Sequence, residues 1–179
     1  MLRLDVSCGP PVGSHRTFAR GQTMSDEELR LPPGAELRRM VRMIRRLNAP
    51  PERVFRAWAD PEELARWFPE RIEGGLAVGA RSMLVWPDRR VWWDVIEAHP
   101  SRTFAFHWPW LPDERLITSV KVTIDPAGYG SRLELVDGPF PLDQPGAIDA
   151  WAEALENWGA TLAMLRAHLD FSVDLRPRG

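Results

Sequence analysis

The stretch "NAPPERVFRAWADPEELARWFP", residues 48–69, decides how this chain folds after its first strand. Pro50 and Pro51 cannot continue a strand ladder, because proline has no backbone N–H to donate. The same missing donor suits the first turn of a helix, where it would have no partner. Val54 and Trp58 are four residues apart and so share one helical face. The first half of the stretch therefore predicts a strand exit followed by a short amphipathic helix.

The second half of the stretch predicts another short helix. Asp60 is a favoured residue for capping a helix, and Pro61 suits the first helical position. Leu64 and Trp67 are three residues apart on the inner side, and Pro69 ends the segment. Two short helices in succession raise the question of what they cover.

The segment before this stretch alternates as a strand does. In residues 37–47 one face carries leucine, valine and methionine together with two arginines, and most of the remaining arginines lie on the other face. This pattern predicts a first strand, with Arg45 on its inward face.

Downstream of the short helices, several strand-like runs alternate with turn sequences. The separators "PDRR", "HPS", "PWLPDE" and "PAGYG" are typical of turns. Short strands at this spacing predict an antiparallel meander. The predicted strands are 80–86, 91–98, 102–108, 116–125 and 131–137.

The apolar period changes near the carboxyl end of the chain. Residues 148–168 contain no proline, and large apolar side chains recur there at steps of four and three. This spacing places one apolar stripe on a long helix. The order strand, two short helices, antiparallel strands and long helix is that of an α+β helix-grip fold. In that fold a curved sheet wraps around the carboxyl-terminal helix, and the short helices close one end of the groove between them.

Four segments in this order resemble the START-like (SRPBCC) superfamily, in the branch similar to the activator of the heat-shock-protein-90 ATPase. The resemblance covers about residues 37–169. At two positions the chain departs from the family: Trp93 stands where the family often has glycine, and Trp158 replaces the usual leucine. Both changes add bulk near the expected groove. The matching segments are "APPERVFRAWADPEELARWF" at 49–68, "HPSRTFAFHW" at 99–108, "GSRLELVDGPF" at 130–140 and "WAEALENW" at 151–158.

Nine tryptophans are many for 179 residues, and each buries on the order of 200 Å². Two interpretations stay open: the aromatic rings line a pocket for a hydrophobic or amphipathic small molecule, or they fill the groove themselves. Arg45 is the candidate polar anchor of such a ligand. The candidate cavity residues are Arg45, Trp67, Phe68, Phe106, Trp108, Phe140, Trp151, Trp158 and Leu162.

An inward arginine needs an acceptor or access to water. The acceptor for Arg45 is either a carboxylate or the anionic group of a ligand. The carboxylates that the sequence offers are Asp94, Glu97 and Glu134.

Composition and motifs exclude several functional classes. A net charge of −2 and a pI near 6.1 argue against a nucleic-acid partner. One cysteine and four scattered histidines give no metal-ligand spacing, so we expect no metal and no cofactor. No motif for a catalytic residue or a nucleotide appears, which favours a binding protein over an enzyme.

Two alternatives to a binding protein follow from the resemblance. The superfamily includes polyketide cyclases and aromatases, which act largely by shaping a reactive chain in the pocket. The family name also suggests a co-chaperone-like module with a chaperone partner. These alternatives stay open beside ligand binding.

The sequence also indicates how the chain is divided. Turn-rich segments predict a flexible tail over residues 1–35, a START-like domain over 36–172 and a short tail over 173–179. No apolar run approaches the ~20 residues that span a bilayer, and no secretory signal is recognisable. We therefore expect a cytoplasmic protein. The sequence does not indicate its oligomeric state.

Overall fold

The computed structural model describes residues 38–110 and 116–176, so the predicted tail at 1–35 lies outside the described residues. Within these residues, seven strands and three helices follow one another. They are β1 (Arg38–Leu47), α1 (Pro51–Ala59), α2 (Pro61–Leu64), β2 (Arg71–Glu73), β3 (Arg81–Val85), β4 (Arg90–His99), β5 (Thr103–Trp110), β6 (Leu116–Ala127), β7 (Gly130–Pro141) and α3 (Ala147–Phe171).

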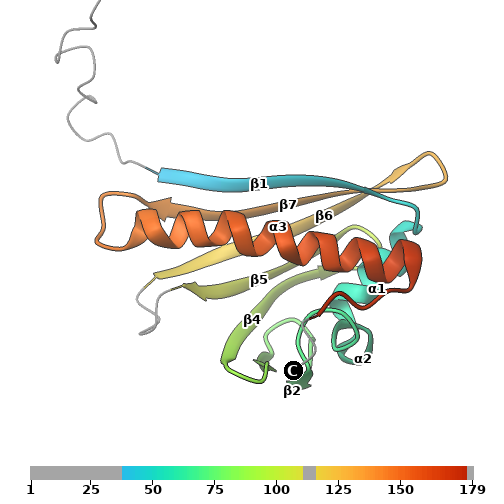
Figure 1. Ribbon diagram of the computed structural model, residues 1–179, viewed down its shortest axis with the longest axis horizontal. Helices are drawn as coiled ribbons and strands as arrows, with labels where there is room; N and C mark the ends of the chain where they lie inside the picture. Colours follow the sequence, from blue (N-terminus) through green and yellow to red (C-terminus); the bar gives the residue numbers. More distant parts are fainter. Residues whose placement is uncertain (1–37, 111–115, 177–179) are drawn as a thin grey trace, which may run out of the picture. The chain divides into compact units, whose positions relative to one another are not determined.

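The strands form one antiparallel sheet in the order β1-β7-β6-β5-β4-β3-β2. The first strand pairs with the last, so the two short helices carry the chain from one edge of the sheet to the other. Helix α3 runs along one face of this sheet, and α1 and α2 lie at one end of the arrangement (Figure 1). This is the α+β helix-grip fold that the order of elements predicted.

Strand alternation decides which side chains face α3. In β6, Val120, Val122 and Ile124 are buried, whereas Lys121 between them is exposed. Successive side chains of a strand point to opposite faces, so the inner face is apolar and the outer face is polar. The inner faces of the strands, the stripe of α3 and the short helices together enclose the core.

Local chemistry explains the two short helices. Pro51 and Pro61 stand at the first helical positions, and Asp60 ends α1 and caps α2. The Asp60 carboxylate accepts the backbone N–H of Glu62 at 2.9 Å and that of Glu63 at 3.4 Å. These bonds satisfy amides that have no partner inside the helix.

Strand β2 was not predicted. Its three residues, Arg71–Glu73, pair with β3 at the sheet edge and contain one apolar side chain, Ile72. Three residues are too few for alternation to be visible in the sequence. Among the described helices none is both long enough and apolar enough to cross a membrane.

Gly130 gives the first test of this fold. A Cβ at Gly130 would overlap the carbonyl oxygen of Leu47, because the start of β7 lies against the end of β1. We expect Gly130→Ala to lower the free energy of unfolding by about 2 kcal/mol or more, since the obstacle is backbone. Chemical denaturation measures this loss.

The matched control is Gly159→Ala in α3, where a Cβ meets no atom within 4 Å. Alanine favours a helix interior over glycine by about 0.5–1 kcal/mol, so this variant should be more stable than the parent. Equal stability of the two variants would contradict the close approach of β7 to β1.

Candidate functional site

A cluster of aromatic rings fills the space between α3, the short helices and the inner face of the sheet. Neighbouring ring centroids lie between 4.2 and 6.5 Å apart, which is the range of direct contact. We call the following buried residues the aromatic cluster: Trp58, Trp67, Phe68, Trp93, Phe104, Phe106, Trp108, Trp110, Phe140 and Trp158.

Trp158 lies at the centre of the cluster. Its indole projects from α3 and is 1% exposed. Ring centroids lie 5.4 Å away at Trp108, 6.2 Å at Phe106 and 6.3 Å at both Phe68 and Trp110. Trp158 is therefore the largest of the fully buried side chains with which α3 packs on the sheet.

A buried carboxylate holds this indole. Trp158 Nε1 donates to Asp137 Oδ2 at 2.7 Å, and Thr118 Oγ1 donates to Asp137 Oδ1. Trp110 Nε1 in turn donates to Thr118 Oγ1 at 3.0 Å. Asp137 on β7 is fully buried. The network joins α3, β5, β6 and β7 through side chains alone.

Burial raises the pKa of Asp137 to about 6, because the charged carboxylate loses its hydration inside the aromatic cluster. Hydrogen bonds from Thr118, Trp158 and Trp110 act in the opposite direction and favour the charged form. No cation from the described residues offsets the burial of Asp137. The carboxyl therefore changes its charge within about one pH unit of neutrality.

A cleft with a volume of about 790 Å³ opens beside the aromatic cluster. It lies between the turn after α2, the β3–β4 hairpin, and α3 with the segment that follows it. Its lining residues are Ala65, Phe68, Glu70, Trp86, Pro87, Asp88, Arg89, Met164, Asp174 and Arg176.

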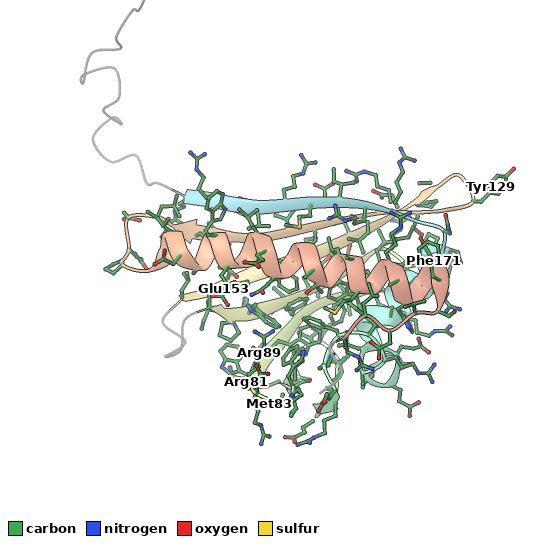
Figure 2. All side chains as sticks on the ribbon, in the orientation of Figure 1. Arg81, Met83, Arg89, Tyr129, Glu153 and Phe171 are labelled. Carbon is green, nitrogen blue, oxygen red and sulfur yellow. The ribbon has the colours of Figure 1, made fainter. Side chains whose placement is uncertain are left out.

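Specific contacts fix the walls of this cleft. Trp86 Nε1 donates to the Phe68 carbonyl oxygen at 3.0 Å, and the two rings meet edge to face at 5.2 Å. The Arg89 guanidinium lies 4.6 Å above the Trp86 ring. Figure 2 places Arg89 at the same side of the molecule as Arg81 and Met83, far from Tyr129.

The opposite wall is held by Arg176. Its Nη1 donates to the carbonyl oxygens of Ala65 at 2.7 Å and Pro69 at 2.8 Å. Its Nη2 pairs with Asp174 at 2.7 Å. These bonds tie the segment after α3 to the turn after α2, so both sides of the cleft are attached to the same turn.

Eight of the nine candidate residues from the sequence fall into three groups. Phe68 lines the cleft. Trp151 is half-buried on α3 and packs against the core. The third group is buried inside the groove and comprises Trp67, Phe106, Trp108, Phe140, Trp158 and Leu162.

Arg45 lies apart from both the cleft and the aromatic cluster. It is half-buried on β1, with the inward orientation that alternation predicted, and its Nη1 donates to the Ile44 carbonyl at 3.0 Å. The carboxylates considered as its partners pair elsewhere on the sheet. Glu97 binds Lys121 at 2.9 Å, and Asp94 binds Arg81 at 2.6 Å.

Glu134, the remaining candidate partner of Arg45, pairs with other arginines. Arg42 and Arg132 both donate to its carboxylate and lower its pKa to about 2. Arg45 therefore has no carboxylate partner among the ion pairs that the described residues form.

Sequence reasoning missed Asp137 and most of the cleft. The signal for Asp137 was present, because it continues the inward series of Leu133 and Leu135 on β7. A carboxylate at an inward position of a strand is unusual. The cleft residues Trp86 and Met164 gave no such signal, since they come from a hairpin turn and a helix far apart in sequence.

The fold and the groove define a helix-grip protein of the START-like class. The sequence model of the family described as Activator of Hsp90 ATPase homolog 1-like protein matches residues 48–170. The chain belongs to this family. No curated protein matches it in sequence.

Solved structures share the fold over most of their length. Protein MLL2253 from Mesorhizobium loti is 25% identical, with a TM-score of 0.66 over 76% of this chain and 100% of its own. The Aha1 dimer from Colwellia psychrerythraea is 15% identical, with a TM-score of 0.65 over 74% of this chain and 97% of its own. CalU16 from Micromonospora echinospora is 21% identical, with a TM-score of 0.62 over 75% of this chain and 78% of its own.

The Asp137 carboxyl predicts an unusual dependence of stability on pH. Its folded-state pKa, about 6, lies above the ordinary value of 3.8, so the folded protein binds this proton more tightly than the unfolded chain does. The resulting stability is fully present below about pH 4 and is lost as pH rises through about 6. We expect a contribution of about 3 kcal/mol.

Urea denaturation at a series of pH values, for the parent and for Asp137→Asn, measures this contribution. The asparagine keeps the size of the side chain and removes its titration. The difference between the two curves should fall across pH 4 to 6. A parallel course of the two curves would show that Asp137 has an ordinary pKa.

Proposed function

We propose that the protein binds a hydrophobic or amphipathic small molecule at the groove between the sheet and α3, in the cleft beside the aromatic cluster. The observation that carries this proposal is the cleft of about 790 Å³, which has Phe68 of the aromatic cluster in its wall. Sites for small molecules are concave, largely apolar and of this size.

The lining of the cleft suits an amphipathic molecule. Phe68, Trp86 and Met164 offer apolar surface for a ring or an alkyl group. Glu70 and Arg89 add charged groups to the same cleft, which suit the polar end of a ligand. Arg45 is outside this lining, so we assign polar recognition to the cleft residues instead.

An enzyme of the cyclase type is the second candidate, because a titratable carboxyl with a raised pKa marks many active sites. Asp137 is that carboxyl. Both of its oxygens accept hydrogen bonds from the protein's own side chains. The route from the cleft to Asp137 passes through Phe68 and Trp158, which contact each other. We therefore favour binding over catalysis.

The co-chaperone alternative needs a different kind of surface. A stable protein partner covers about 800 Å² on each side. The cleft is concave and lies between a hairpin, a turn and a helix, which suits a small molecule better.

The binding proposal is tested with anilinonaphthalene sulfonate, an amphipathic fluorescent probe. The Trp86 ring forms one wall of the cleft, so Trp86→Ala removes apolar contact area from the site. Loss of a large aromatic contact is worth about 1.5–3 kcal/mol. We expect the affinity for the probe to fall at least about tenfold, as measured by fluorescence titration of the folded protein.

Trp92→Ala is the matched control. Trp92 also lies beneath an arginine, with the Arg81 guanidinium 4.3 Å from its ring, but it is not part of the cleft lining. This variant should bind the probe as the parent does. Equal losses in the two variants, or no binding to the parent, would contradict the proposed site.

A further inference from the structure

We propose that Trp158 acts as a depth stop: it holds Phe68 in the wall of the cleft and so limits how far a ligand enters, which selects ligands whose apolar part is short. The inference rests on the proposed function and adds the class of ligand. It is carried by the contacts that join the cleft wall to a fixed indole.

The first step is the connection between the cleft and Trp158. Phe68 lines the cleft and is only 4% exposed, so most of its side chain is packed against the protein. The Phe68 ring meets the Trp158 ring at 6.3 Å and the Trp108 ring at 6.2 Å. The space behind Phe68 is therefore occupied by packed aromatic rings.

The second step is the fixed position of the indole. Trp158 Nε1 donates to Asp137, and four neighbouring rings contact its faces and edges. If the indole swung away, the fully buried Asp137 would lose a hydrogen-bond donor, which is strongly unfavourable. The ring therefore stays in place when a ligand enters, and the cleft does not deepen.

The third step is the consequence for the ligand. Apolar groups gain affinity only where they leave water. A single ring or a short alkyl chain fits against Phe68, Trp86 and Met164, with its polar end beside the charged residues of the cleft. A longer chain meets Phe68, which Trp158 holds from behind, and its remaining length extends back into solvent. The structure therefore assigns compact amphiphiles, rather than long acyl chains, to this site.

The test compares straight-chain alkanoates from hexanoate to palmitate, below their micelle concentrations, by isothermal titration calorimetry. Each methylene that becomes buried raises affinity about fourfold. In the parent protein the affinity should rise with chain length and then become constant. In Trp158→Ala the rise should continue to longer chains, and the longest should bind at least about tenfold more tightly than they bind the parent.

Trp93→Ala is the matched control, because Trp93 is also a fully buried tryptophan of the aromatic cluster. Its ring contacts are with Phe104 and Phe106, not with Phe68. A cavity there does not adjoin the cleft, so the chain-length profile should match that of the parent. Circular dichroism checks the fold of each variant, and Trp158→Leu with Trp93→Leu replaces the alanine pair where alanine prevents folding.

The outcomes separate the two proposals. If the parent binds alkanoates and Trp158 variants show the same limit of chain length, the depth stop is wrong while the binding site stands. If Trp93 variants shift the limit as far as Trp158 variants do, general loosening of the core explains the effect and the depth stop is again wrong. If neither the parent nor any variant binds an alkanoate or the fluorescent probe, the proposed function itself fails.

Discussion

The hydrogen bond from Trp158 to Asp137 is the constraint on which the interior of this protein depends. It joins the long helix to the sheet at 2.7 Å, in a region where both partners are almost fully buried. An aromatic core packed only by contact has many arrangements of similar energy, whereas a buried polar pair permits few. The position of α3 over the sheet is therefore fixed by a directional hydrogen bond as well as by the burial of apolar surface.

Among the described residues this arrangement packs the groove with rings, and the cleft lies beside them. Ten rings of the aromatic cluster contact one another, and the cleft opens where the cluster ends at Phe68. The outer walls of the cleft come from the β3–β4 hairpin and from the segment after α3, both held to the turn after α2 by Trp86 and Arg176. The packed core thus borders the cleft, and the surrounding loops supply its charged side chains.

The sequence predicted those strands and helices in which apolar residues recur at a clear period. The five downstream strands, the first strand and the long helix were found from alternation and from the stripe that includes Trp158. Strand β2 was missed because three residues show no period. The cleft was missed because Trp86 and Met164 meet only after the chain has folded. The choice between a lined and a filled groove depends on ring positions, which no spacing in the sequence determines.

Strand β7 shows why residue type alone does not identify the site. Glu134 and Asp137 are three residues apart and so lie on opposite faces. On the outer face of the sheet, Arg42 and Arg132 lower the pKa of Glu134 to about 2. On the inner face, desolvation raises the pKa of Asp137 to about 6. The outer carboxylate is a surface ion pair, which contributes little to stability. The inner one has hydrogen bonds from Thr118, the tryptophans and the Gly138 backbone to favour its charge but no cation, so its protonation changes near pH 6.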